Sequence, residues 1–149
     1  MSIQALLELV GNDPEYGEWH TLSQEMIKEF AELTGDHQWI HVDVDRSKRE
    51  SPFGTTVAHG MLVQSMIPRL LGDNISWMEN FSSGINLGSD KVRFTAPVRS
   101  GSRIRGGWSI KSVVDGSAGS VRVIMPVTVA VEGESKPACY AELVSILYP

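Results

Sequence analysis

Several features that define whole classes of proteins are missing from this sequence. Cys139 is its one cysteine, so a disulfide within the chain and a zinc site built from cysteines are both excluded. No stretch of about 18 residues is apolar and free of charge, so no segment is expected to span a membrane. The first ten residues have no basic segment and include Glu8, which argues against a secretory signal peptide. We therefore expect a reducing compartment, the cytoplasm.

Positive charge is also scarce. The net charge is −5, and no cluster of lysines and arginines has the length that binding along a phosphate backbone requires, so nucleic acid is not an expected partner. Gly-x-Gly-x-x-Gly, Gly-Lys-Ser/Thr and Gly-x-Ser-x-Gly patterns are absent, as are clusters of carboxylates. Redox-cofactor, nucleotide-hydrolysing and serine-hydrolase activities therefore have no support, and the prediction is that the protein uses neither a cofactor nor a metal ion.

What remains is the composition of an ordinary globular protein. Apolar residues make up 42% of the 149, charged residues make up 21%, and there are seven prolines. A chain of this length can bury about 70% of its unfolded surface around one core. Residues 1–149 are therefore predicted to form a single domain.

Helical patterns dominate the first half of the chain. Apolar spacing predicts helices over residues 3–10, from the N-cap Ser23 to Gly35, and from Val57 to Leu71, where Pro68 should kink or end the helix. Residues 12–17 are rich in turn formers, and residues 19–22 are a connector or a short strand. Residues 42–54 are polar and predict an exposed segment with about one helical turn.

The second half of the chain has the character of β-structure. Four segments rich in β-branched and aromatic residues cover residues 84–97, 102–114, 119–132 and 137–148. Four successive strands imply an antiparallel sheet, and helices followed by strands indicate an α+β domain. The helix that begins at Val57 is the candidate to cover the sheet.

Asp36 and His41 are the leading candidates for chemistry. They lie five residues apart, just after Gly35, which is expected to end a helix. A carboxylate gains nothing from the helix dipole at that end, so its position favours function over capping. A carboxylate and an imidazole are the groups that transfer protons near neutral pH. The alternative is a turn residue and a half-buried structural imidazole.

Gly60 is the second candidate, and it opens the Val57–Leu71 helical pattern together with His59. The first backbone N–H groups of a helix can stabilise a developing negative charge, and the absence of a Cβ lets a carbonyl group approach. Tight packing at the helix start is the alternative reason for a glycine. His59 is interpreted as structural because an anion hole needs only the backbone, and His20 and His37 stay unassigned.

Basic residues gather between positions 85 and 105. They predict either a solvated strand face or contacts to the phosphates of a carrier. The residues are Lys91, Arg93, Arg99, Arg103 and Arg105.

Two segments carry a resemblance to a known family. FAELTGDHQWIHVD (residues 30–43) and PFGTTVAHGML (residues 52–62) resemble the MaoC-like dehydratases, the (R)-specific enoyl-CoA hydratases of the hot-dog fold. NLG (residues 86–88) and KVRFTAPV (residues 91–98) are similar to the strand that follows in that family. The resemblance covers roughly residues 20–147.

The resemblance implies a fold and a reaction. The fold would be a curved antiparallel sheet wrapped around one long helix, from Val57 onward, in a protein that pairs into homodimers. Asp36 and His41 would hold a water molecule and add it to a trans-2-enoyl thioester, giving a (3R)-3-hydroxyacyl-CoA without cofactor or metal. The Gly60 N–H would bind the thioester oxygen, and Asn86 and Gly88 would contact the substrate, an acyl-CoA of fatty acid metabolism.

The sequence departs from the family pattern in two places. Gln38 and Trp39 stand where many hydratases have Asn-Pro, which resembles the NodN-like branch, and Pro68 stands where some members have a serine. Two other functions stay open. One is a thioesterase of the same fold, which also uses a carboxylate and a helix N-terminus, and the other is a non-catalytic module that binds acyl thioesters.

Overall fold

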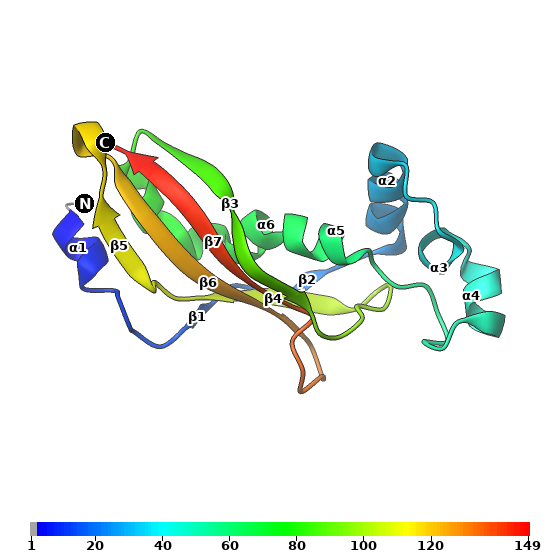
Figure 1. Ribbon diagram of the computed structural model, residues 1–149. Coiled ribbons are helices and arrows are strands. Elements are labelled where there is room, and N and C mark those ends of the chain that lie inside the picture. The colour runs from blue at the N-terminus through cyan, green and yellow to red at the C-terminus, as the bar shows by residue number, and fades with distance from the viewer. Residues whose placement is uncertain (1–2) are drawn as a thin grey trace.

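The computed structural model describes residues 3–149, which form a curved antiparallel sheet and a set of short helices (Figure 1). Within this part of the chain, no helix combines the length and the apolar character needed to cross a membrane. The helical segments are α1 (Ile3–Leu7), α2 (Gln24–Thr34), α3 (Trp39–Val42), α4 (Val44–Glu50), α5 (Gly60–Ser65), α6 (Ile67–Leu71), η1 (Gly72–Asn80) and η2 (Ser117–Gly119). The strands are β1 (Glu15–Tyr16), β2 (His20–Thr21), β3 (Ser83–Phe94), β4 (Arg103–Trp108), β5 (Ser112–Asp115), β6 (Val121–Val131) and β7 (Cys139–Tyr148).

The sheet follows the order β1-β4-β6-β7-β3, with β2 also paired to β4 and β5 to β6. Each of these pairings is antiparallel. Strand β3 lies at one edge of the sheet, beside the C-terminal strand β7. The predicted antiparallel sheet of an α+β domain is confirmed.

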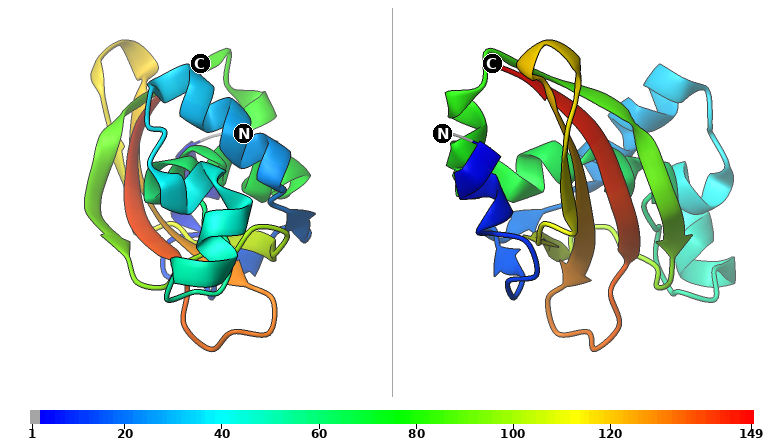
Figure 2. Two further views of the ribbon diagram at one scale, coloured as in Figure 1. Left: turned by 90° about the vertical axis from the view of Figure 1, so that its right-hand side faces the viewer. Right: turned by 60° about the vertical axis from the view of Figure 1, so that its left-hand side comes forward.

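Strand β6 shows how the sequence forms the core. Its buried and more exposed residues alternate from Val121 to Val131, as a strand with one face against a helix layer requires. The buried face belongs to the same hydrophobic core as Ile67 and Leu70 of α6, which are almost fully buried. Figure 2 shows the sheet curving around these helices, which lie on its concave side.

The helix predicted from Val57 to Leu71 lies where expected, and the predicted interruption near Pro68 is confirmed, but the predicted start at Val57 was wrong. Val57 pairs with Arg99, and the Ala58 N–H donates to the Val98 carbonyl at 2.8 Å, so the backbone is still extended there. The helix begins at Gly60 and divides at Met66 into α5 and α6. Pro68 is in the first turn of α6, a position where its missing N–H costs nothing.

Other predicted boundaries shift for local reasons. The strand expected over residues 102–114 is divided into β4 and β5, which pair with successive parts of β6 on either side of Pro126. The helix expected over residues 3–10 ends at Leu7, and Val10 instead pairs with Ile110. The polar segment over residues 42–54 holds more helix than predicted, because Asp43 caps α4 by accepting from the Arg46 N–H at 2.9 Å.

Three short helices stand apart from the sheet, at the N-terminal end of α5. Figure 1 shows α2, α3 and α4 together there, beyond the end of the sheet. A curved antiparallel sheet around a central helix is the arrangement of the hot-dog fold. The connections into and out of these three helices bring together the residues described next.

Candidate active site

Asp36 is positioned by the end of α2. Ser23 caps the start of this helix, and Gly35 ends it in the left-handed conformation, with φ of 78° and its N–H donating to the Ala31 carbonyl at 2.8 Å. The predicted helix end and the place of Asp36 just beyond it are confirmed. The Asp36 side chain is 54% exposed, and its Oδ1 accepts from the Gln38 N–H at 3.3 Å.

His41 is in α3 and is buried. Its Nδ1 lies 2.6 Å from the carbonyl oxygen of Val57, which can only accept, so Nδ1 carries the proton. Nε2 is then left with a lone pair. Gln24 fixes the backbone at this point by donating to the His41 carbonyl at 2.8 Å. The arrangement presents a neutral imidazole that can accept a proton.

The surroundings of His41 favour this neutral form. Burial lowers the pKa of His41 below its ordinary value of 6.5. The hydrogen bond to the Val57 carbonyl opposes that shift, neighbouring His59 adds to it, and the Asp36 carboxylate opposes it weakly. The net effect is a lowered pKa, so the His41 imidazole is unprotonated at Nε2 at neutral pH and can act as a base.

His59, for which the sequence predicts a structural role, belongs to the same group of side chains. Its ring stacks on that of His41, with 3.8 Å between centroids and 26° between planes. Its Nε2 lies 3.0 Å from the Asp36 carbonyl oxygen and 4.0 Å from carboxylate oxygen Oδ2. The one available signal was its place directly before Gly60.

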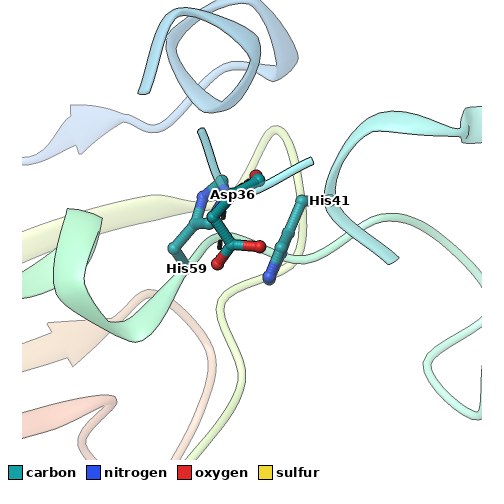
Figure 3. A group of neighbouring side chains, drawn as sticks. All are labelled: Asp36, His41 and His59. Carbon is teal, nitrogen blue, oxygen red and sulfur yellow. Dashed lines mark hydrogen bonds and ion pairs between the residues drawn. The ribbon is translucent and has the colours of Figure 1, made fainter. Parts of the chain in front are cut away.

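The three side chains converge from three separate segments (Figure 3). One potential ligand atom from each of Asp36, His41 and His59 lies within 4.8 Å of the others. They line a pocket of about 380 Å³ that opens to solvent, and the other lining residues are Phe30, Thr34, Gly60, Met61, Ser65 and Phe94. The structure therefore brings together the predicted acid/base pair and the predicted anion-binding glycine.

Gly60 is packed too closely for any side chain. A Cβ at this position would lie 2.9 Å from ring atoms of Phe94, which comes from the end of β3. As the first residue of α5, Gly60 has an N–H without an acceptor inside the helix. Gly60 and Phe94 also line a second cavity beside Phe53 and Pro97, so the Phe94 ring stands between two hollows.

The other two predicted substrate-binding residues lie elsewhere. Asn86 lines an apolar cavity of about 170 Å³ between α6, η1 and the sheet, farther along the helix than Asp36. Gly88 is in a bulge of β3, where its N–H donates to Asn86 Oδ1 at 2.9 Å. Neither residue lines the pocket of Asp36 and His41.

The basic residues divide between pairing and exposure. Arg103 pairs with Glu132 at 3.0 Å, and Arg99 lies 3.7 Å from Glu134. Lys91 lies 3.4 Å from Glu142. Arg105 is stacked between the rings of two aromatic residues, and Arg93 is exposed beside Phe94. Most of the run is therefore paired with acidic side chains or stacked on aromatic rings.

Among residues 3–149, Asp36, His41 and His59 form the one group that could hold a metal ion, and its geometry suits that poorly. Two imidazoles and a carboxylate are ligands that divalent transition metals accept. However, the two imidazole rings are stacked on each other rather than directed at a common metal position. His59 Nε2 is also bonded to a backbone carbonyl. His37, four residues before His41, lies outside the group and 3.7 Å from Glu32.

The chain is similar in sequence to known proteins. A model of the MaoC-like domain family matches residues 6–132. The chain is 43% identical over 141 residues to 3-hydroxyacyl-thioester dehydratase Z of Mycobacterium tuberculosis, covering 95% of this chain and 92% of that protein. It is 40% identical over 149 residues to nodulation protein N of Rhizobium meliloti, covering 98% of this chain and 91% of that protein.

Solved structures agree on the fold. The (R)-hydratase from A. caviae involved in PHA biosynthesis superposes with a TM-score of 0.72 at 19% identity, covering 93% of this chain and 97% of that one. A MaoC-like dehydratase from Rhodospirillum rubrum gives a TM-score of 0.74 at 18% identity, covering 96% and 95%. At such low identity these likenesses establish the architecture alone.

Proposed function

The chain belongs to the MaoC-like dehydratase family, and from this premise we propose that it adds water reversibly to a trans-2-enoyl thioester to give a (3R)-3-hydroxyacyl-CoA. Its relatives include enzymes named 3-hydroxyacyl-thioester dehydratase and 3-hydroxybutyryl-CoA dehydratase, so it is a hydro-lyase. The observation that carries the finer proposal is the shared pocket of Asp36, His41 and Gly60.

Asp36 and His41 would hold one water molecule between them. The carboxylate and the unprotonated Nε2 both accept hydrogen bonds. Together they can accept hydrogen bonds from both O–H groups of one water molecule, which aims its oxygen at the substrate. As that oxygen bonds to the β-carbon, one proton moves to the Asp36/His41 pair and then to the α-carbon. Water is thus consumed in full, and both new bonds form on the face of the substrate toward the pair.

Gly60 would stabilise the charge that this addition creates. Attack on the β-carbon moves electrons through the conjugated system onto the thioester oxygen, which becomes enolate-like. A free N–H at the start of a helix is a donor already aimed at such an oxygen. The close packing of Phe94 on Gly60 supports this assignment, because it fixes where the helix begins.

The apolar cavity beside α6 would receive the acyl tail. It is enclosed by helical and strand residues that include Leu71, Trp77 and Leu143, with Asn86 and Ser145 as polar members. Such a lining suits a hydrocarbon chain better than a charged group. Under this assignment Asn86 contacts the tail rather than the reacting atoms.

The proposed reaction uses no metal ion or cofactor, because each proton that moves has a donor and an acceptor among water, Asp36 and His41. Removal of metal ions is therefore expected to leave the activity unchanged. The measurement is kcat after dialysis against a chelator, compared with mock-dialysed protein. A loss restored by one divalent metal would contradict this part of the proposal.

The function is tested with a short trans-2-enoyl-CoA. We expect the conjugated absorbance to disappear without release of free CoA thiol, whereas a thioesterase would release the thiol and a binding module would do neither. Cys139 does not interfere with thiol detection, because it is fully buried and burial raises the pKa of its thiol.

Matched variants assign the residues. Asp36→Asn and His41→Ala are each expected to lower kcat by about 100-fold or more, the usual worth of a proton-transfer group. Asp45→Asn and His37→Ala are the controls, because both change exposed side chains near the site in sequence but outside the pocket. Full activity in Asp36→Asn would contradict the proposed chemistry.

We also propose that the protein is a homodimer joined through β3. This twelve-residue strand is at the sheet edge, and ten of its residues are exposed, among them Ile85 at 50%, Leu87 at 53% and Phe94 at 47%. A long exposed edge strand is rarely left unpaired, because its free backbone groups can pair with another strand.

A further inference from the structure

His59 is a buried polar residue whose side chain is not used for capping. It is the N-cap residue of α5, yet its side chain makes no hydrogen bond to the first turn of that helix. Its imidazole is 4% exposed. Burying a polar ring is costly unless its hydrogen-bonding groups are used elsewhere. The contacts of the ring therefore indicate its role.

One of these contacts holds the segment that carries Asp36. Residues 34–38 are all exposed, so packing does little to fix them. The other hydrogen bonds of Asp36 are local, from its N–H to Thr34 Oγ1 at 3.4 Å and from the Gln38 N–H to Oδ1. Within residues 3–149, the bond from His59 Nε2 to the Asp36 carbonyl is the one that links Asp36 to a distant part of the chain.

The second contact fixes the plane of His41. The His59 ring covers one face of the His41 ring at 3.8 Å, and Phe30 packs against His59 at 5.0 Å between centroids. His41 is thus held by its bond to the Val57 carbonyl at one edge and by a neighbouring ring at one face. The direction of its Nε2 lone pair follows from these two restraints.

The hydrogen bonds also define the tautomer of His59. A carbonyl oxygen only accepts, so Nε2 carries the proton. Nδ1 is buried and has no partner within the described residues.

We propose that His59 is a positioning residue, which sets the spacing between the Asp36 carboxylate and His41 Nε2 so that one water molecule can bridge them. This inference rests on the proposed function, since the spacing is meaningful only if both groups act on the same water. His59 itself transfers no proton to the substrate, because its Nε2–H is bonded to the backbone carbonyl of Asp36.

Two substitutions separate the contacts. His59→Phe keeps a ring that can stack on His41 but removes the N–H bonded to Asp36. His59→Gln loses the ring but carries an Nε2 donor that can reach the same carbonyl. If the bond to Asp36 is what matters, Phe is expected to lower kcat by up to about 100-fold, the effect of a misplaced catalytic group, and Gln to restore part of that loss. KM should change by less than about twofold, because Gly60 and the apolar cavity remain.

The pH profile supplies a readout that lost stability alone would not move. The titratable groups facing His59 are Asp36, from the segment after α2, and His41, from α3, whereas α2 and β3 present the uncharged Phe30 and Phe94. Because His59 contributes to the lowered pKa of His41, His59→Phe should move the acid limb of kcat/KM to higher pH.

The outcomes are distinct. Wild-type kcat and an unmoved acid limb in His59→Phe would overturn the proposal, as would equal losses in both variants in step with a lowered Tm, which would indicate a structural role. If the wild type hydrates no enoyl-CoA, the proposed function fails instead. The geometry is then tested by NMR titration of His41 in the resting protein, where His59→Phe is expected to raise its pKa and an unchanged titration would overturn the coupling.

Discussion

At the scale of single residues, the site combines an exposed carboxylate with a buried imidazole. Asp36 is over half exposed, whereas His41 is 7% exposed and bonded to the Val57 carbonyl. The pair could be predicted from sequence because Gly35 ends a helix just before it. The neighbour His59 could not, since its stacking on His41 depends on how a segment 18 residues further along the chain is folded back.

The lowered pKa of His41 predicts the pH dependence of activity. The imidazole must be unprotonated to accept a hydrogen bond from the water, so kcat/KM should fall on the acid side as His41 gains a proton. Because burial lowers that pKa, the acid limb is expected below pH 6.5 in the free enzyme. A pH profile of kcat/KM, with controls for buffer effects, tests this prediction. An acid limb well above pH 6.5 would contradict it.

The same shift affects stability. Between the lowered folded pKa and the ordinary value of 6.5, the unfolded chain binds more protons at His41 than the folded protein does. The free energy of unfolding should therefore fall as the pH drops through this window. Urea denaturation at several pH values measures the effect, which should be smaller in His41→Gln. An equal pH dependence in that variant would assign it to other groups.

At the scale of elements, the start of α5 is the least predictable and most consequential boundary. Apolar spacing continues back to Val57, but Val57 and Ala58 bond to the Arg99 and Val98 segment and stay extended. Such bonds join residues about 40 positions apart and leave no trace in local periodicity. The strands were easier to predict. In β6, for example, buried and more exposed residues alternate along consecutive positions, which is a local pattern in the sequence.

Gly60→Ala tests whether the close contact between the first turn of α5 and the Phe94 ring is needed for activity. The added Cβ would lie 2.9 Å from the Phe94 ring, so the ring or the helix start must shift. If this shift moves the Gly60 N–H away from the thioester oxygen, we expect kcat to fall by about 100- to 1,000-fold, the usual effect of losing an anion-hole donor. Phe94→Leu in the same chain should relieve the contact and recover activity. Equal losses with and without Phe94→Leu would show that this contact is not the cause.

At the scale of the whole molecule, the position of the site depends on three parts of the structure: the sheet, the central helices α5 and α6, and the group of helices α2 to α4. The sheet curves around α5 and α6, and α2 to α4 gather at the start of α5 (Figure 1). The side chains of Asp36, His41 and His59 converge there. Composition and element order predicted this α+β architecture, and the family resemblance predicted the curvature. Pro68 predicted that the central helix would kink or end early, and the structure shows that a second helical piece follows the interruption.

The exposed edge of β3 predicts the oligomeric state. The wild type is expected to be a dimer by light scattering, and Leu87→Arg should shift it toward the monomer by placing a charge on the apolar edge. Val114→Arg is the matched control, since Val114 is 56% exposed but lies on β5, away from that edge. A monomeric wild type, or equal dissociation of both variants, would contradict the assignment of the interface.

The most direct test of the central claim, that Asp36 and His41 act on one water from one side of the substrate, is a hydration reaction in deuterated water. The product of a short trans-2-enoyl-CoA would be isolated, and the configurations at its α- and β-carbons determined. We predict deuterium and hydroxyl added to the same face, with a (3R) hydroxyl. Addition to opposite faces, or a (3S) product, would contradict the account.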